Sequence, residues 1–180
     1  MICVVGSGII ILEEIRLEDE MEEERINLKM DELATLIEYP VEKHDLLATA
    51  MRAIRTGTSN DELSNERLAL VGDKVLALVV VDCFYKKDYS KGVIDAIRQR
   101  LDNNRLQYRL ICDLNIIDFA YNDKHFYTDE QPDHERVSNR AHTGYLEAII
   151  GAIYYDAGYE LTRQWILNWL MPKLKEIADK

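Results

Sequence analysis

The fold is decided by residues 67–85, which read RLALVGDKVLALVVVDCFY. Apolar residues recur along the whole stretch, and residues 75–81 contain no polar residue at all. A stretch of this length that is apolar on every side is typical of a helix in the middle of a core, because buried strands are shorter. The sequence therefore predicts a central helix over 67–85 that is buried on nearly all sides.

Helical spacing of apolar residues continues on both sides of this central segment. It is found in residues 30–37, 43–54, 91–101, 105–114, 144–157 and 161–177. Pro40 ends the first of these helices, and the Asp-Asn-Asn sequence at 102–104 offers a side-chain cap for the helix that follows it. Residues 121–143 form a long polar loop in this interpretation. No β-alternation is long enough to build a sheet, so the predicted fold class is all-α.

Length and composition describe a globular chain with an acidic beginning. Its 180 residues can bury a full core, and 47% of them are hydrophobic, which excludes collagen-like, low-complexity and disordered classes. A net charge of -11 disfavours binding to a phosphate backbone except through a local basic patch. Eight of the thirteen residues in 13–25 are acidic. We therefore expect an acidic N-terminal segment over residues 1–30 and one domain over residues 31–180.

Three further features exclude classes of protein. Cys3, Cys83 and Cys112 are isolated and form no C-x-x-C pair, which predicts an intracellular, reducing compartment without disulfides or a zinc site. The apolar opening, residues 1–12, lacks a basic start and is too short to span a bilayer, so we expect no membrane partner. Residues 4–8 read VVGSG, but isoleucine occupies the third glycine position of a dinucleotide-binding turn, which argues against that function.

Two carboxylates fall within the most apolar helical segments, Asp73 in the central helix and Glu147 in the segment over 144–157. An ionised carboxylate removed from water costs several kcal/mol unless it is paired, hydrogen-bonded or bound to a cation. One interpretation is a site shared between the two helices. The other is that the carboxylates form ordinary ion pairs with Lys74, Arg67 or Arg140.

The chemistry of these acids indicates a hard cation. Glu66 lies seven residues before Asp73, which places both carboxylates on one face of a helix. Mg²⁺ prefers oxygen ligands and is commonly held by one or two protein carboxylates when a phosphate completes its shell. Two such acids therefore suffice for one metal ion.

The sequence also resembles a known family. Residues 64–76, SNERLALVGDKVL, are similar to the signature helix of the ribonuclease III family, commonly written N-E-R-L-E-[FY]-L-G-D-[AS]-V-L. Residues 145–156, YLEAIIGAIYYD, resemble its second motif helix, D-x-x-E-A-x-x-G-A-[IV]-[YF]-x-D. The likeness extends in the right order over most of residues 31–172. It implies an all-α endonuclease domain that dimerises, binds double-stranded RNA in a valley and cleaves it with magnesium held by four acids.

The four acids match this chain only in part. Asp73 and Glu147 stand where the family has the last acid of each motif, so the resemblance assigns them as the catalytic and Mg²⁺-binding residues. Ala69 and Gly144 stand where the other two metal-binding acids belong. Neither residue can ligate a metal ion through its side chain, and metal-assisted hydrolysis requires ligands that fix the ion. We therefore expect a ribonuclease III-like protein with impaired catalysis and weak or absent Mg²⁺ binding.

The resemblance also bears on partners. Glu66 matches a family glutamate near the RNA and the dimer interface, and Leu70 replaces the aromatic side chain that enters the partner subunit. A smaller apolar residue can still fill such a pocket, so a homodimer is expected. Because the sequence reaches Lys180 directly after the closing helix, we expect no double-stranded-RNA-binding domain of the kind that many relatives carry. RNA affinity is then expected to rest on the nuclease domain alone, or on a partner.

Three functions follow from this reading. The first is recognition or processing of double-stranded RNA with impaired catalysis. The second is an active magnesium-dependent endoribonuclease, in which two carboxylates and the RNA phosphates hold enough metal. The third is a structural subunit of a ribonucleoprotein, or a partner of an active nuclease, which uses the fold for protein contacts.

Overall fold

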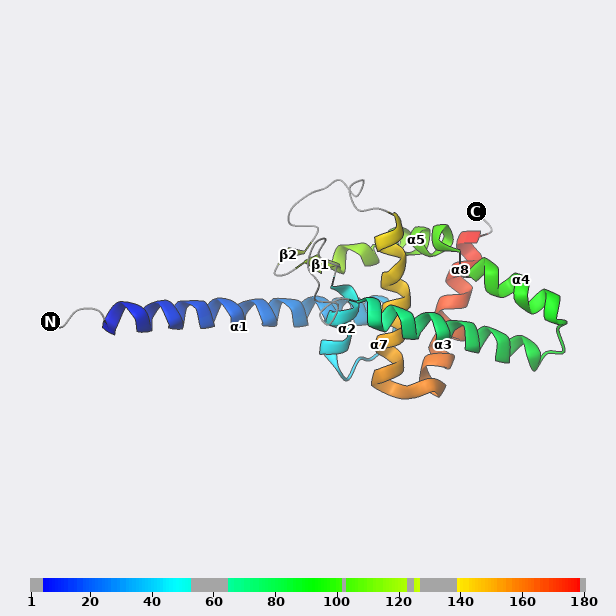
Figure 1. The fold of residues 1–180 in the computed structure, drawn as a ribbon, viewed down its shortest axis with the longest axis horizontal. Coiled ribbons are helices and arrows are strands. Elements are labelled where there is room, and N and C mark those ends of the chain that lie inside the picture. The colour runs from blue at the N-terminus through cyan, green and yellow to red at the C-terminus, as the bar shows by residue number, and fades with distance from the viewer. Residues whose placement is uncertain (1–4, 53–64, 102, 123–124, 127–138, 179–180) are drawn as a thin grey trace.

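The computed structural model describes residues 5–52, 65–101, 103–122, 125–126 and 139–178 (Figure 1). The described elements are α1 (Val5–Leu36), α2 (His44–Met51), α3 (Glu66–Tyr85), α4 (Lys91–Leu101), α5 (Asn104–Asp113), the 3₁₀ helix η2 (Ile116–Phe119), β1 (Tyr121–Asn122), β2 (His125–Phe126), α7 (Asn139–Trp165), the π-helix η4 (Ile166–Leu170) and α8 (Met171–Ala178). The two strands form one short antiparallel pair. The predicted all-α class is confirmed.

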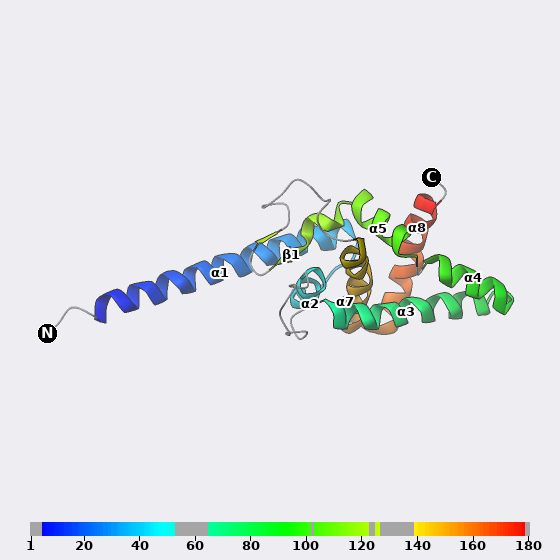
Figure 2. The same cartoon turned by 45° about the horizontal axis from the view of Figure 1, so that its top comes forward.

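The core is built around α3 and α7, which cross and bury apolar side chains against each other. Helices α2 and α5 pack on α7, α4 packs on α3, and α8 packs on α5 (Figures 1 and 2). Val79 of α3 and Ile149 and Ile150 of α7 are fully buried. Full burial of each such side chain stabilises the fold by about 1.5–3 kcal/mol. The α3–α7 pair is therefore the centre of the domain.

A pair of glycines sets the distance between these two helices. A Cβ atom at Gly72 of α3 would overlap the carbonyl oxygen of Glu147, and one at Gly151 of α7 would overlap the carbonyl oxygen of Leu68. Only glycine allows the two backbones to approach this closely. We refer to Gly72 and Gly151, with the backbone each touches, as the glycine contact.

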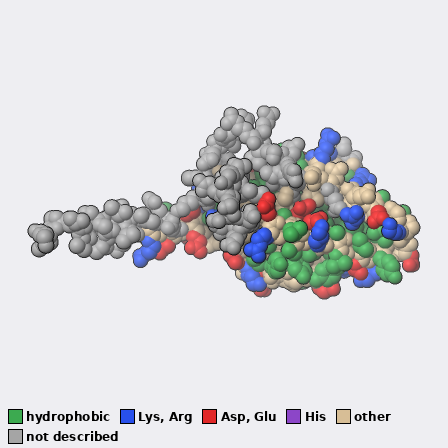
Figure 3. Space-filling model, viewed as in Figure 1, with side chains coloured by type: hydrophobic (Ala, Val, Ile, Leu, Met, Phe, Trp, Pro, Cys, Tyr) green, Lys and Arg blue, Asp and Glu red, His purple; other side chains and the backbone are tan. Residues whose placement is uncertain are grey.

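The central helix is less enclosed than its sequence predicts. Leu70, Leu78, Val81 and Tyr85 lie on the outer side of α3 and are exposed. Figure 3 shows hydrophobic side chains gathered over this part of the surface. The prediction of burial on nearly all sides was wrong, because α7 and α4 cover only part of α3. We refer to these four residues as the α3 face.

The first helix crosses the predicted domain boundary. Helix α1 continues without a break through residue 30, and its N-terminal part projects away from the body of the molecule (Figures 1 and 2). Met30, Leu33 and Ile37 are fully buried, so the end of α1 and the residue that follows it belong to the core. The division into residues 1–30 and 31–180 stays a prediction.

The ends of α5 and α7 agree only in part with the helix and loop boundaries predicted from the sequence. Asn103 caps α5, because its side chain accepts hydrogen bonds from the backbone N–H groups of Arg105 and Leu106, at 2.9 and 3.4 Å. The predicted loop over 121–143 was wrong at its end, since α7 already begins at Asn139, and residues 127–138 lie outside the described part. The break predicted between 157 and 161 is present as a kink at Gly158, whose φ is 77°. No described helix is long and apolar enough to cross a membrane.

Candidate functional site

Four positions singled out by the sequence meet where α3 and α7 cross. Asp73 directly follows Gly72, and Gly72 touches the backbone of Glu147. One turn before Asp73 on the same helix lies Ala69, whose Cβ would be 4.0 Å from a Cβ built at Gly144. The structure thus brings the backbone positions of Asp73 and Glu147 close to the crossing that also holds Ala69 and Gly144.

Asp73 lies at the edge of this crossing. Its side chain is 31% exposed, and its carboxylate accepts a hydrogen bond from the Lys74 ammonium at 2.6 Å. This ion pair was one of the alternatives that the sequence left open. Lys74 is itself 74% exposed, and a pair of this kind contributes at most about 1 kcal/mol to stability. The lysine therefore neutralises Asp73 without holding it firmly.

Ala69 and Gly144 leave room where acids would stand. Both residues are half-buried, and the 4.0 Å between the two Cβ positions is an ordinary van der Waals distance. Among the described residues, no other atom outside the helix's own backbone and the adjacent residues lies within 4 Å of a Cβ at Gly144. The backbone at position 144 therefore accepts a side chain, in contrast to Gly72 and Gly151.

Glu66 and Leu70 lie on the same helix but outside the crossing. Glu66 is exposed in the first turn of α3, where a negative charge interacts favourably with the helix dipole. Leu70 is 65% exposed and begins the α3 face. Both side chains are therefore available to a partner, and their roles stay a prediction.

The carboxylate oxygens available at the crossing, those of Asp73 and Glu147, fit a hard cation only in part. Among the described residues no group of three or more histidine, cysteine or acidic side chains is arranged to hold a metal ion. Asp73 and Glu147 suit one Mg²⁺ that takes its other ligands from water and phosphate. They do not suit a site built from four acids, because Ala69 and Gly144 bring no oxygen donor.

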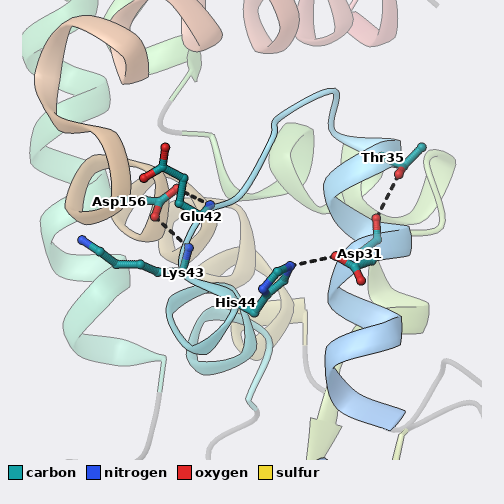
Figure 4. A network of polar contacts seen from close by, with 6 residues as sticks. All are labelled: Asp31, Thr35, Glu42, Lys43, His44 and Asp156. Atoms are coloured by element: carbon teal, nitrogen blue, oxygen red, sulfur yellow. Dashed lines mark hydrogen bonds and ion pairs between the residues drawn. The ribbon is translucent and has the colours of Figure 1, made fainter. Parts of the chain in front are cut away.

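Sequence patterns gave no sign of a second polar cluster, which lies further along α7, just before the kink at Gly158. The Asp156 carboxylate accepts hydrogen bonds from the Tyr39 hydroxyl (3.2 Å) and from the backbone N–H groups of Glu42 (3.1 Å) and Lys43 (2.9 Å). Figure 4 shows Asp156 beside Glu42 and Lys43. Burial, together with the charge of Asp156, raises the pKa of the Tyr39 hydroxyl above its usual value. The cluster fastens the loop after α1 to α7.

Next to this cluster, His44 and Asp31 connect α2 to α1. His44 Nε2 lies 2.7 Å from Asp31 Oδ1, as Figure 4 shows.

Asp156 is the last residue of the second motif, and its spacing alone gives no hint that its partners come from residues 39–43. Its hydrogen bonds indicate a structural role.

Comparison with protein families places most of this region in one known domain. The family described as "Ribonuclease III domain" matches residues 66–158, which contain the whole of α3 and the α3–α7 crossing. The match therefore includes the glycine contact and all four positions of the candidate site.

Curated relatives extend the similarity towards the N-terminus. Ribonuclease 3 of Idiomarina loihiensis is 31% identical over 147 residues, which cover 81% of this chain and 61% of that protein. Ribonuclease 3 of Francisella tularensis subsp. novicida is 27% identical over 144 residues, which cover 79% and 58%. The chain thus spans about three fifths of the length of these relatives.

Solved structures agree with the sequence comparison. A nuclease domain of ribonuclease III from Campylobacter jejuni is similar with a TM-score of 0.64 and 25% identity, over 82% of this chain and 97% of that one. It is described as showing structural flexibility in a region involved in dimer formation. A second structure of the same domain matches with the same TM-score and identity.

Proposed function

The chain belongs to the ribonuclease III family, and from this premise we propose that it recognises or processes double-stranded RNA with impaired catalysis. The proposal that catalysis is impaired rests on the contact between positions 69 and 144. Alanine and glycine face each other at the α3–α7 crossing, in the two places where the family has metal-binding acids. The backbone of the site is kept, but half of its oxygen donors are missing.

The retained acids define what chemistry is left. Asp73 and Glu147 would hold Mg²⁺, which, when bound, supplies an activated water and charge stabilisation at the leaving oxygen. The Asp73 carboxylate accepts a hydrogen bond from Lys74 at 2.6 Å, so that lysine competes with a cation for the same oxygen atoms. With two carboxylates and a competing lysine, we expect weak metal binding and slow hydrolysis.

The α3 face supports a homodimer as part of this proposal. Contiguous exposed apolar surface on a soluble protein commonly marks a binding site for another macromolecule. Leu70 and Leu78 lie on this face, next to the candidate site on the same helix, and Glu66 is one turn from Leu70. We propose that a second copy covers the α3 face and that Glu66 lies beside the RNA at the edge of that interface. Cys83 and Cys112 are free, Cys3 lies outside the described residues, and an intracellular, reducing compartment stays a prediction.

Each of the two alternatives is favoured by one observation. The net charge of -11 opposes binding to a phosphate backbone, which favours a structural subunit or a nuclease partner over an RNA-binding protein. Retention of Asp73 and Glu147 favours the opposite alternative, an active enzyme. Both alternatives predict results that differ from those of the main proposal.

The test is a magnesium-dependent cleavage assay on long double-stranded RNA, combined with retention of the same RNA at moderate salt. The matched control is the Asp73→Asn, Glu147→Gln double variant, whose side chains keep their shape and lose their charge. We expect the wild-type chain to retain RNA and to cleave it slowly or not at all. Rapid cleavage that disappears in the double variant would establish the active enzyme instead. Failure to retain RNA would favour the structural role.

A further inference from the structure

Two surface features have no partner within the described part of the chain. The first is a row of exposed apolar side chains along α1, which begins on its projecting part and ends where the helix meets the core. Leu17, Met21 and Leu28 are 52%, 70% and 60% exposed. They lie four and seven residues apart, which places them on one side of the helix. We refer to them as the α1 row.

The second feature is a groove between α4, α5, η4 and α8. It is a cavity of about 530 Å³ lined mainly by apolar side chains, among them Ile97, Leu106, Leu167 and Met171. Arg100 and Lys175 are the two charged residues that line it. Its volume suits two or three anchoring side chains of a bound helix. We refer to it as the C-terminal groove.

The charges of the two regions are opposite. The sequence of α1 contains ten acidic and three basic residues, a net charge of -7. Helices α4, α5 and α8 together contain seven basic and three acidic residues, a net charge of +4. In a chain with a net charge of -11 this separation is large, and it favours encounter between the two regions.

The two features of one molecule cannot meet. The end of α1 is fixed in the core by buried residues such as Met30 and Leu33, and the helix continues from there without a break. In both views its N-terminal part points away from α4 and α8, which lie at the opposite end of the molecule (Figures 1 and 2). Contact between the α1 row and the C-terminal groove therefore requires two molecules.

We propose that α1 of one copy docks into the C-terminal groove of a second copy. The α1 row enters the apolar cavity, and the acidic residues beside it face Arg100 and Lys175. An RNA backbone would meet the same two cations but would leave the apolar lining of the groove uncovered, so the lining favours an amphipathic helix. The contact joins two different surfaces head to tail, so it builds chains or rings and leaves the α3 face free.

Two variants break the contact from either side. Leu17→Gln with Met21→Gln and Leu28→Gln removes the α1 row, and Arg100→Glu with Lys175→Glu reverses the charge of the groove. All five side chains are exposed, so both variants are expected to fold. We expect each buried apolar side chain that is lost to weaken association about tenfold or more.

Sedimentation velocity on the full chain measures the result. The wild-type chain is expected to form species larger than a dimer as its concentration rises, and each variant alone is expected to stop at a dimer or below. The two variants mixed together still offer one intact row and one intact groove. When one of them is labelled, adding the unlabelled other should make it sediment as a larger species. Pairing through the α3 face alone leaves the mass at that of a dimer, so the two contacts are distinguishable.

Matched controls change similar residues elsewhere. Tyr155→Gln with Leu161→Gln removes apolar side chains of similar exposure, and Lys86→Glu with Lys87→Glu makes the same change in charge outside the groove and outside α4, α5 and α8. Both controls should associate like the wild-type chain. Identical sedimentation of the wild-type chain and both row and groove variants would overturn the proposal. The proposal would also be overturned if neither variant sediments faster in the mixture than it does alone. RNA retention by the row variant is expected to be unchanged, because its substitutions leave the candidate site intact.

Discussion

The α3–α7 crossing contains two glycine-lined regions that differ in what they require. At the glycine contact, Gly72 and Gly151 touch the opposing backbone and leave no room for a Cβ atom. At Gly144 the nearest atom to such a Cβ is the Cβ of Ala69, at 4.0 Å. Glycine is needed for packing in the first region and is sterically optional in the second. The comparison separates residues that hold the fold from residues that decide the chemistry.

This difference explains why the fold does not depend on acids at positions 69 and 144, where the family resemblance implies two metal ligands. The helices are held at their distance by backbone contact, which does not depend on the side chains at 69 and 144. Acids at those positions would add oxygen donors and negative charge but no packing that the crossing needs. Substitutions at positions 69 and 144 are therefore expected to have little effect on stability.

The largest expected effect is on stability at the glycine contact. Gly72→Ala should lower the free energy of unfolding by about 3 kcal/mol or more, because the added methyl group overlaps the backbone of Glu147 and must push the helices apart. Urea denaturation measures this loss. The control is Gly92→Ala in α4, where no atom lies within 4 Å of the new Cβ and no loss is expected. Equal stability of the two variants would mean that the glycine contact does not set the helix distance.

The second effect is on activity at the other region. Ala69→Glu combined with Gly144→Asp restores the acid set and should raise magnesium-dependent cleavage of double-stranded RNA about a hundredfold or more, since metal stabilisation of the transition state contributes several kcal/mol. The same pair of substitutions in an Asp73→Asn, Glu147→Gln background should give no increase. An unchanged cleavage rate in a folded variant would show that more than the missing acids prevents catalysis.

A smaller effect is expected at the far end of α7. Tyr39→Phe removes the hydrogen bond to Asp156 and should cost about 1 kcal/mol at neutral pH. The pKa of Tyr39 is raised in the folded chain, so its contribution to stability is complete below the unfolded pKa of about 10 and declines as the pH rises above that value. Unfolding measured between pH 8 and 11 should therefore show a steeper loss for the wild-type chain than for the variant. Parallel curves would exclude a role for Tyr39 in that loss.

The smallest effect tests whether glycine is needed at position 144. Gly144→Ala should stabilise the chain by about 0.5–1 kcal/mol, because alanine favours a helix and its Cβ meets only Ala69 at an ordinary distance. Thermal unfolding compares this variant with Gly151→Ala, which should be strongly destabilised in the same helix. A destabilised Gly144→Ala variant would remove the distinction between the two regions.

Much of the fold could be predicted from local patterns, and much of the site could not. Spacing of apolar residues predicted the central helix, and the Asp-Asn-Asn sequence predicted the cap that Asn103 provides. Periodicity does not say which apolar side a neighbour covers, so the exposed side chains of the α3 face, such as Tyr85, were missed. Only the family resemblance joined positions 69 and 144, because they are far apart in the sequence and neither carries a functional group. The partners of Asp156 likewise depend on tertiary structure.

The glycine contact also bears on the history of the chain. Since backbone contact holds α3 and α7 together, side chains at 69 and 144 can change without any rearrangement of the fold. We therefore expect the single variants Ala69→Glu and Gly144→Asp to keep the fold, so that either acid can be gained before the other. Acids at these positions are thus expected to be open to gain or loss for as long as Gly72 and Gly151 hold the helices together.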